Sequence, residues 1–265
     1  MALTPALSGA GGMPTATQVA ERADAVRERI RGAGGSVAAT RIVAVTKGFG
    51  PEAVSAAVGA GLVDVGENYA DELVAKDAAV GDRARARLWH FLGRVQRNKV
   101  GRLAPLVAWW HGVDRVSAGR EVARRAPGAR VLVQVNVSGD ATRNGCSFEA
   151  VPALVDDLSR LDLEVVGLMA VGPPGPPEAA RAGFRGLAAM RERLGLSELS
   201  MGMTGDLEVA VQEGTTMLRL GRALFGERPP AAQRRQEGRS RFEIPRIEQS
   251  GPGGGDRLER PRRRV

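Results

Sequence analysis

One lysine stands out as a residue that could bond covalently to an aldehyde. The chain has 35 arginines and only three lysines, so arginine supplies nearly all of its cations. Lys47 lies where the apolar run 42–45 meets the loop 46–51. A lysine amine can form a Schiff base with a carbonyl compound, whereas a guanidinium cannot. A solvated loop lysine explains this position equally well, so Lys47 alone does not fix the chemistry.

The other residues with chemical potential stand in weaker patterns. Lys76 falls late in a charged helical segment, and Lys99 lies among arginines. His90 could act as a general base, but a half-buried histidine with its hydrogen bonds satisfied is the simpler interpretation. Cys146 is the single cysteine, which excludes an internal disulfide and a multi-cysteine metal site. The two histidines have no ligand-type spacing, so we expect no metal site.

Apolar runs alternate with amphipathic segments along most of the chain. Strand-like runs occur at 42–46, 62–65, 88–92, 107–110, 130–137, 164–170, 197–201 and 215–220. Helical spacing occurs at 16–33, 51–60, 69–79, 117–125, 148–158, 178–194 and 206–213. This alternation implies parallel strands joined by right-handed crossovers. It predicts an α/β protein with a single TIM-type (β/α)8 barrel. An open doubly wound sheet is the alternative, although no G-x-G-x-x-G follows the first strand to favour it.

In such a barrel the functional residues gather at the carboxyl ends of the strands. Lys47 follows the first strand, and loops rich in glycine or hydroxyl residues follow the seventh and eighth, at 200–206 and 219–226. Loops of this kind bind phosphate because backbone N–H groups and helix dipoles converge there. A Schiff-base lysine that faces a phosphate site indicates pyridoxal 5′-phosphate (PLP) as the cofactor.

Several spaced motifs resemble those of one protein family. They are Thr46-Lys47, Gly66-Glu67-Asn68-Tyr69, Trp89-His90-Phe91-Leu92-Gly93, Gln134-Val135-Asn136-Val137-Ser138, Gly167-Leu168-Met169-Ala170, Leu199-Ser200-Met201-Gly202-Met203 and Arg219-Leu220-Gly221. In this order they resemble the YggS/PROSC-type pyridoxal phosphate homeostasis proteins over residues 16–228. The resemblance implies one barrel like the N-terminal domain of alanine racemase (fold-type III). It also implies that PLP is held covalently on a lysine, without established catalytic turnover.

The resemblance further implies a set of cofactor-binding residues. These are Lys47, Asn68, Ser200, Gly202, Met203, Thr204, Arg219, Gly221 and Arg222. Lys47 would form the Schiff base beside Asn68, and the loops after strands seven and eight would form the two sides of a phosphate cup. Arg219 would face the pyridine nitrogen and leave it unprotonated, because a guanidinium keeps its own proton at neutral pH. Without the resemblance, an ion pair between Arg219 and a nearby carboxylate is an equal alternative.

The chain departs from the family's usual pattern at a few positions near this site. Arg222 stands where threonine is common, Arg143 stands where lysine is frequent, and Thr204-Gly205-Asp206 replaces Ser-Asp-Asp. These changes keep the lysine and the hydroxyl of the phosphate loop. They alter the groups around the phosphate, so the affinity for PLP is expected to differ from that of relatives.

Two classes of function agree with these residues. One is a PLP-binding protein of intracellular PLP homeostasis that is not an enzyme and whose recipients would be PLP-dependent apo-enzymes. The alternative is a fold-type III enzyme such as an amino-acid racemase. Such enzymes add a β-rich domain that supplies a second catalytic group, whereas the residues after Gly226 read as a tail. One-base racemisation by Lys47 alone should be slow, so we favour the homeostasis protein.

The charge of the chain is concentrated at one end. Ten arginines and five acidic residues lie between 231 and 265, which accounts for +5 of the net charge of +8. We expect a disordered N-terminus at 1–15, the PLP-binding barrel at 16–228 and a disordered basic tail at 229–265. No aromatic residues interleave with the basic ones as in nucleic-acid-binding segments, and no transmembrane run or signal peptide is evident. We therefore expect a cytoplasmic monomer that binds neither membranes nor specific nucleic acids.

Overall fold

The computed structural model describes residues 13–228 of the chain. Within them, eight strands form a closed barrel in sequence order, and every neighbouring pair is parallel. The strands are β1 (Arg41–Val45), β2 (Asp64–Glu67), β3 (Leu88–Phe91), β4 (Val107–Val113), β5 (Ala129–Val135), β6 (Leu163–Ala170), β7 (Glu198–Ser200) and β8 (Met217–Leu220). The closed barrel confirms the predicted fold class and excludes the open sheet. The expected disordered segments at 1–15 and 229–265 lie largely or wholly outside the described residues, so they stay predictions.

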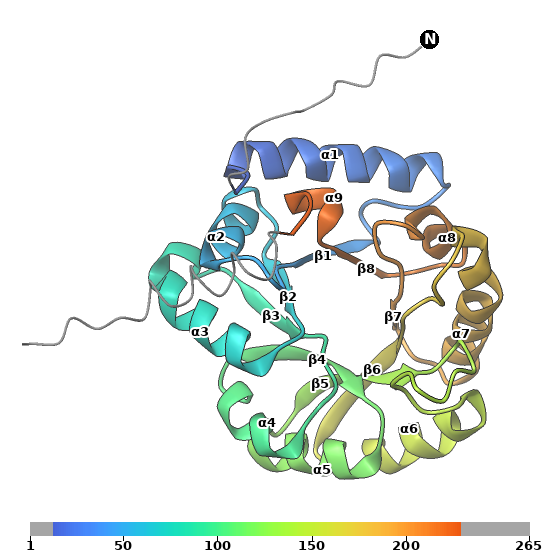
Figure 1. Cartoon of the computed structure of the whole chain (residues 1–265). Coiled ribbons are helices and arrows are strands. Elements are labelled where there is room, and N and C mark those ends of the chain that lie inside the picture. The colour runs from blue at the N-terminus through green and yellow to red at the C-terminus, as the bar shows by residue number, and fades with distance from the viewer. Residues whose placement is uncertain (1–12, 229–265) are drawn as a thin grey trace, which may run out of the picture. The chain divides into compact units, whose positions relative to one another are not determined.

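Helices form a ring around the barrel (Figure 1). They are α1 (Ala16–Gly32), α2 (Pro51–Gly59), α3 (Ala70–Val80), α4 (Arg97–Leu103), α5 (Val116–Arg125), α6 (Val151–Ser159), α7 (Arg181–Arg193), α8 (Leu207–Gln212) and α9 (Arg222–Phe225). Three 3-10 turns accompany them: η1 (Gly81–Ala84), η2 (Phe148–Ala150) and η3 (Pro177–Ala180). None of the helices in the described part is long and apolar enough to cross a membrane.

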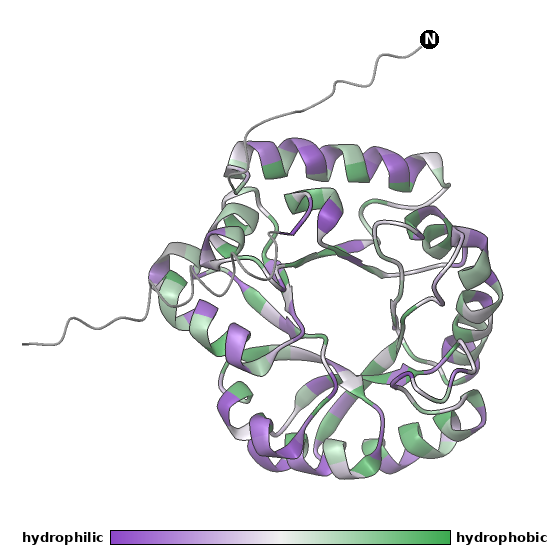
Figure 2. Cartoon of the chain, in the orientation of Figure 1, coloured by the Kyte–Doolittle hydropathy of each residue, from purple (hydrophilic) through white to green (hydrophobic). Residues whose placement is uncertain are grey.

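The sequence of α1 shows how these helices are specified. Thr15 and Gln18 form a capping box in which each side chain accepts a hydrogen bond from the backbone N–H of the other. The buried residues Val19, Ala23, Val26 and Ile30 recur every three or four positions, so they lie on one face of the helix. Figure 2 shows hydrophobic and hydrophilic residues alternating along the surrounding helices in the same way.

The structure corrects several predicted element boundaries. The second strand was expected at 62–65, but β2 runs from Asp64 to Glu67, where it pairs with residues 88–91 of β3. The two acidic residues of β2 are buried, which an apolar pattern does not predict. The fifth strand ends at Val135 instead of 137, because the N–H of Asn136 bonds to the loop carbonyl of Cys146. Neither α4 nor α9 was expected. α4 has three basic residues among seven, and α9 is only four residues long, so hydrophobic periodicity gives little signal for either.

The barrel interior has its own small apolar cluster, separate from the core between strands and helices. Its buried members are Val43, Trp109, Leu132, Val166, Met169 and Met217. Strands β6 and β7 approach each other closely because Gly167 has no side chain. At Gly167 of β6, a Cβ atom would lie 2.1 Å from the carbonyl oxygen of Glu198 in β7. This contact sets the position of β7, which carries Ser200 towards the barrel interior.

Replacement of Gly167 by alanine tests this close approach. We expect the free energy of unfolding to fall by about 1–3 kcal/mol, because a strand backbone must move to admit the methyl group. The control is Gly32→Ala, where the new methyl meets nothing within 4 Å and the helix favours alanine. Urea denaturation of both variants measures the difference. Equal stability of the two variants would contradict the proposed strand contact.

Candidate functional site

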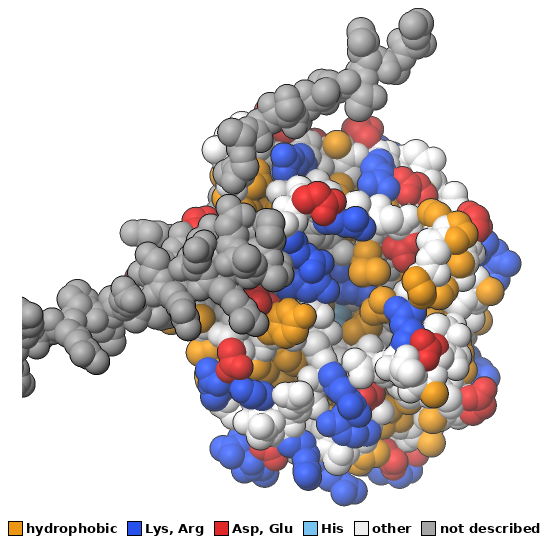
Figure 3. Space-filling model, viewed as in Figure 1, with side chains coloured by type: hydrophobic (Ala, Val, Ile, Leu, Met, Phe, Trp, Pro, Cys, Tyr) orange, Lys and Arg blue, Asp and Glu red, His pale blue; other side chains and the backbone are white. Residues whose placement is uncertain are grey.

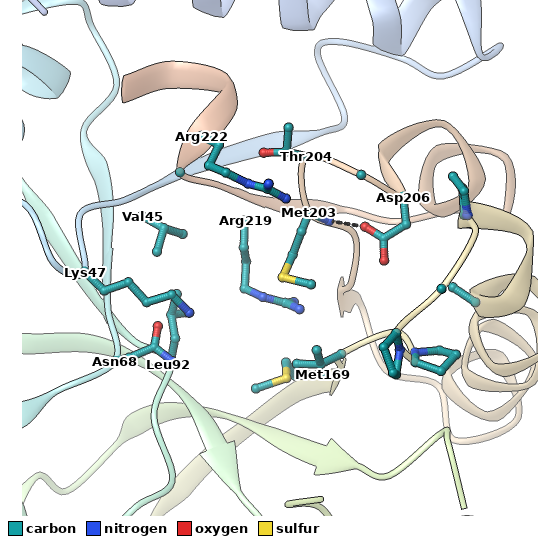
Figure 4. A pocket seen from close by; sticks show the side chains of 18 of the residues that line it. Val45, Lys47, Asn68, Leu92, Met169, Met203, Thr204, Asp206, Arg219 and Arg222 are labelled. Atoms are coloured by element: carbon teal, nitrogen blue, oxygen red, sulfur yellow. Dashed lines mark hydrogen bonds between the residues drawn. The ribbon is translucent and has the colours of Figure 1, made fainter. Parts of the chain in front are cut away.

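A pocket of about 480 Å³ opens at the carboxyl ends of the strands. Seven of the nine predicted site residues line it: Lys47, Asn68, Met203, Thr204, Arg219, Gly221 and Arg222. Figure 4 shows most of these side chains around one hollow, with Lys47 in the loop that follows β1 and Arg219 on the neighbouring strand β8. Figure 3 shows lysine and arginine side chains around the centre of the same face. The pocket therefore brings together predicted site residues that are as much as 175 positions apart, from 47 to 222.

A buried ion pair supports the loop that carries Lys47. The ammonium of Lys76 donates to Glu67 at 2.6 Å, to Glu72 at 3.0 Å and to the carbonyl of Thr46 at 2.8 Å. The hydroxyl of Thr46 donates to the same Glu67 carboxylate at 3.2 Å. Lys76 is 5% exposed and Glu67 is fully buried. These contacts fix the backbone immediately before Lys47 and leave Lys76 with no free approach for a small aldehyde.

Lys47 has a different environment from the other two lysines. It is half-buried at the pocket wall, whereas Lys99 pairs with Asp71 at the protein surface. Burial lowers the pKa of Lys47 below its usual range, and the positive charges of Arg228 and Arg219 lower that pKa further, while Glu67 opposes them. A lowered pKa increases the fraction of neutral amine, which is the nucleophilic form.

Arg219 is a buried cation without an ion pair to any carboxylate in the described part of the chain. Its side chain is 5% exposed, and its Nη1 donates to the carbonyl oxygen and the hydroxyl of Ser200 at 2.6 and 2.7 Å. Its Nη2 donates to the carbonyl of Ala170 at 2.7 Å. Burial lowers the pKa of Arg219 to about 10, while the charge of Asp206 acts in the opposite direction. The carboxylate pairing considered from sequence is thus absent among residues 13–228.

The donors of Arg219 are only partly used. A guanidinium side chain has five N–H donors, and three of them have the acceptors just named. The Nε–H and one Nη2–H have no acceptor among residues 13–228, and Arg219 lines the pocket. The pocket thus contains an oriented positive group with donors to spare.

The loops after β7 and β8 form the other end of the pocket. The hydroxyl of Thr204 accepts a hydrogen bond from the N–H of Ala223 at 3.2 Å, which ties the two loops together. Asp206 accepts from the N–H of Met203 at 2.6 Å. Gly221 begins the turn into α9, and a Cβ atom there would lie 3.2 Å from the carbonyl of Val45. Arg222 lies at the exposed rim of this end.

Two predicted site residues do not line the pocket. Ser200 is fully buried, and its hydroxyl contacts Arg219 and His111 instead of the open space. Gly202 has a φ of 91°, and its carbonyl accepts a hydrogen bond from the N–H of Arg219 at 3.0 Å. A Cβ atom at Gly202 would lie 2.5 Å from that of Ala210. Ser200 and Gly202 therefore act indirectly, because both accept hydrogen bonds from Arg219, which lines the pocket.

Several pocket residues escaped sequence reasoning. Arg228 was placed at the barrel's last position without a role, yet it lines the pocket and its charge acts on Lys47. The proline-rich segment 173–177 also lines the pocket, as does Asp206 at the end of the predicted phosphate loop 200–206. The carboxyl-end rule could have identified the segment 173–177, since it follows β6. Nothing in the sequence indicated that the side chain of Arg228 lies at the pocket.

The histidines and the cysteine lie away from the pocket. His90 and His111 are fully buried and do not line it, which agrees with the structural interpretation of His90. Burial raises the pKa of the Cys146 thiol to about 11, so this cysteine is a poor nucleophile. Within residues 13–228, no cluster of three or more His, Cys, Asp or Glu residues could hold a metal ion.

The fold and the pocket define a class of protein. The sequence profile of the family described as "Alanine racemase, N-terminal domain" matches residues 22–229. Among solved structures with this fold, histidine racemase from Leuconostoc mesenteroides superposes with a TM-score of 0.60 at 17% identity, covering 81% of this chain and 58% of that one. This likeness is one of fold alone. Proteins with higher sequence identity to this chain indicate a narrower family within the class.

Relatives over nearly their whole length place the chain within this class. The pyridoxal phosphate homeostasis protein of Pseudomonas aeruginosa is 40% identical over 223 residues, which are 80% of this chain and 95% of that protein. The protein of the same name from Escherichia coli K12 is 33% identical over 226 residues, covering 77% and 94%. The structure of PipY from Synechococcus elongatus with PLP bound has a TM-score of 0.70 at 30% identity, covering 78% of this chain and 100% of that one. The chain belongs to the pyridoxal phosphate homeostasis protein family.

The influence of Arg228 on Lys47 can be measured directly. Removal of a nearby positive charge favours the ammonium form, so Arg228→Ala should raise the pKa of Lys47. Modification of Lys47 by an amine-reactive reagent, followed by mass spectrometry across pH, should then require a higher pH than in the wild type. Arg102→Ala is the control, because Arg102 pairs with Asp71 at the surface. An unchanged profile for Arg228→Ala would contradict the electrostatic role of Arg228.

Proposed function

We propose that this chain binds PLP in the pocket at the carboxyl ends of its strands, with the cofactor's aldehyde held by Lys47, and serves PLP homeostasis without catalytic turnover. The observation that carries the proposal is the joint presence in one pocket of a half-buried lysine with a lowered pKa and a buried Arg219 that has no carboxylate partner among residues 13–228. The names of the relatives and the PLP-bound PipY structure support it.

The pocket has the size and chemistry for such a ligand. Its volume of about 480 Å³ falls within the range of small-molecule sites. The Oδ1 atom of Asn68 is buried and has no hydrogen-bond partner in the described part of the chain, which is costly unless a ligand or water satisfies it. The Nε–H and one Nη2–H of Arg219 are likewise unused. These unsatisfied groups lie on the same pocket as Lys47.

Each residue would then have a definite task. When bound, PLP supplies an aldehyde that condenses with a primary amine and a pyridine ring that can accept electrons. Lys47 would hold the aldehyde carbon, and Asn68 would contact the ring. Thr204, Arg222 and the backbone N–H groups around Gly221 would bind the phosphate. Arg219 would donate to the ring nitrogen and, because it keeps its proton, leave that nitrogen a poor electron sink.

The described residues offer little for the alternative, a fold-type III racemase. Racemisation at a useful rate needs a second acid or base opposite the lysine. The single tyrosine, Tyr69, is 59% exposed and does not line the pocket. Both histidines are enclosed in the barrel interior. Asp206 lines the pocket, but its carboxylate accepts a hydrogen bond from the N–H of Met203.

The wider biological assignments extend this proposal. We infer that the barrel at 16–228 is the complete PLP-binding unit, that it acts as a monomer in the cytoplasm, and that it passes PLP to apo-enzymes. The absence of a membrane-crossing helix among residues 13–228 agrees with this setting. A basic tail at 229–265 would add weak attraction to polyanions without specific recognition of nucleic acid.

The covalent role of Lys47 is tested by substitution and labelling. We expect the wild type with PLP to show a visible absorbance band and, after borohydride reduction, a pyridoxyl label on Lys47. Lys47→Arg should lose both while it keeps its melting temperature, because only the covalent contact is removed. Lys99→Arg should keep both, since Lys99 pairs with Asp71 at the surface. A label found mainly on Lys76 or Lys99 would sink the proposal.

The role of Arg219 is tested by the spectrum of bound PLP. Arg219→Glu should allow the ring nitrogen to be protonated and shift the absorbance band. Because a carboxylate there would also face the carbonyls of Ser200 and Ala170, Arg219→Gln should accompany it as an uncharged comparison. The wild type should meanwhile show no substantial racemase or decarboxylase turnover with common amino acids. Robust turnover would overturn the non-enzymatic assignment.

A further inference from the structure

A continuous chain of hydrogen bonds crosses the barrel interior and ends at the proposed cofactor site. It starts at Asp64, the first residue of β2, whose Oδ1 lies 2.9 Å from His90 Nε2. His90 Nδ1 lies 2.9 Å from His111 Nε2, and His111 Nδ1 lies 2.9 Å from the Ser200 hydroxyl. That hydroxyl accepts from Arg219 Nη1 at 2.7 Å. The chain links the amino end of one strand to the pocket at the opposite end of the barrel.

All members of this chain are removed from solvent. His90, His111 and Ser200 are fully buried, Arg219 is 5% exposed and Asp64 is 9% exposed. They lie beside apolar residues of the barrel interior, and the ring of His90 stacks on that of Trp109. A buried polar group costs about 1–3 kcal/mol when it lacks a partner. Apolar side chains would fill the same volume without this cost, so packing alone does not explain the chain.

The two ends of the chain fix its direction. Arg219 can only donate hydrogen bonds, and an ionised Asp64 can only accept them. If both histidines are neutral, the Ser200 O–H donates to His111 Nδ1, His111 Nε2–H donates to His90 Nδ1, and His90 Nε2–H donates to Asp64. Each link then has one proton, and no other arrangement with neutral imidazoles satisfies every link. With both imidazoles neutral, this geometry requires the Nε2–H tautomer at each ring.

The surrounding charges agree with this protonation state. Burial lowers the pKa of His90, against the opposing effect of Asp64. Burial, His90 and the nearby guanidiniums hold the pKa of His111 well below its usual range. Burial alone would raise the pKa of Asp64, but His90 and Arg41 together lower it. The groups that act on the two rings are Asp64 on β2, Arg41 on β1, Glu198 on β7 and Arg219 on β8.

We propose that Asp64, His90, His111 and Ser200 are positioning residues that hold Arg219 in one orientation through a polarised hydrogen-bond relay. Asp64 accepts at the far end of the relay, where its carboxylate also pairs with Arg41 at 3.0 Å, so it orients the relay while Arg219 itself has no adjacent carboxylate partner among residues 13–228. The relay fixes the Nη1 end of the guanidinium, so its spare donors keep one direction into the pocket. This proposal rests on the proposed function only in that Arg219 faces the cofactor ring.

The protonation pattern can be tested without any cofactor. The chain contains only two histidines, so ¹⁵N NMR of histidine-labelled protein resolves both imidazoles directly. We expect two neutral rings at neutral pH, each protonated on Nε2, with a coupling across the His90–His111 hydrogen bond. A ring that is charged at neutral pH, or that carries its proton on Nδ1, would overturn the relay.

The coupling to the cofactor site is tested with variants of His90, which does not line the pocket. His90→Leu breaks two links and should shift the absorbance maximum of bound PLP and its pH profile, and weaken PLP binding by about tenfold. His90→Gln should retain most of the wild-type spectrum, because its amide can donate towards Asp64 and accept from His111. Leu132→Ala is the control for a destabilised barrel interior and should leave the spectrum unchanged.

The outcomes separate the relay from the proposed function. If His90→Leu binds PLP with the wild-type spectrum and affinity, or if Leu132→Ala reproduces its shift, the relay is wrong while PLP binding at Lys47 stands. If the wild type fails to bind PLP at Lys47 but shows the two Nε2–H tautomers, the proposed function fails and the relay stands. Should His90→Leu not fold, the NMR measurement on the wild type still decides.

Discussion

The burial of one guanidinium, with no adjacent carboxylate in the described part of the chain, is the constraint on which the interior of this barrel depends. Arg219 is 5% exposed, and a buried charge is tolerated only when hydrogen bonds replace its hydration. The carbonyls of Ser200 and Ala170 and the Ser200 hydroxyl supply three acceptors. That hydroxyl must in turn be satisfied, which draws His111 into the interior. A single cation thus explains why polar residues occupy space that apolar ones could fill.

The two buried or half-buried lysines show how the environment decides the chemistry of identical side chains. Lys76 is compensated by Glu67 and Glu72 and holds the backbone of Thr46, so its charge serves the structure. Lys47, one residue further along, has arginines as its strongest charged neighbours, and its pKa is lowered. A lysine at a pocket wall with a lowered pKa has more of its amine in the neutral, nucleophilic form.

The same barrel supports several functions, so the fold alone does not assign one. Racemase and decarboxylase structures superpose on this chain at 17–18% identity, which establishes architecture only. The family is set by relatives of 33–40% identity over nearly their whole length. Function must then be argued from the site. Among the described residues the pocket wall contains Lys47 and Arg219, whereas the single tyrosine and both histidines lie outside it.

The sequence by itself determined the architecture and indicated PLP as the cofactor. Alternating strand and helix periods predicted the barrel, and the barrel places strand ends together, so Lys47 and the loops at 200–206 and 219–226 could be assigned to one face. Motif spacing then indicated the family. These features are local or follow from topology. They do not require knowledge of where any side chain points.

Only the tertiary structure decided which polar groups meet. The sequence did not reveal that Ser200 lies under Arg219, that His90 and His111 join Asp64 to this pair, or that Arg228 lines the pocket. The sequence also made Lys76 a weaker candidate for the Schiff base than Lys47. The structure supplies the physical reason, because the ammonium of Lys76 is bound to Glu67. The physical reason is that hydrogen bonds and charge effects depend on distances of a few ångströms between residues far apart in the chain. Those distances are set by barrel closure, strand register and side-chain rotamers. The periodicity of the sequence carries no information about these three features.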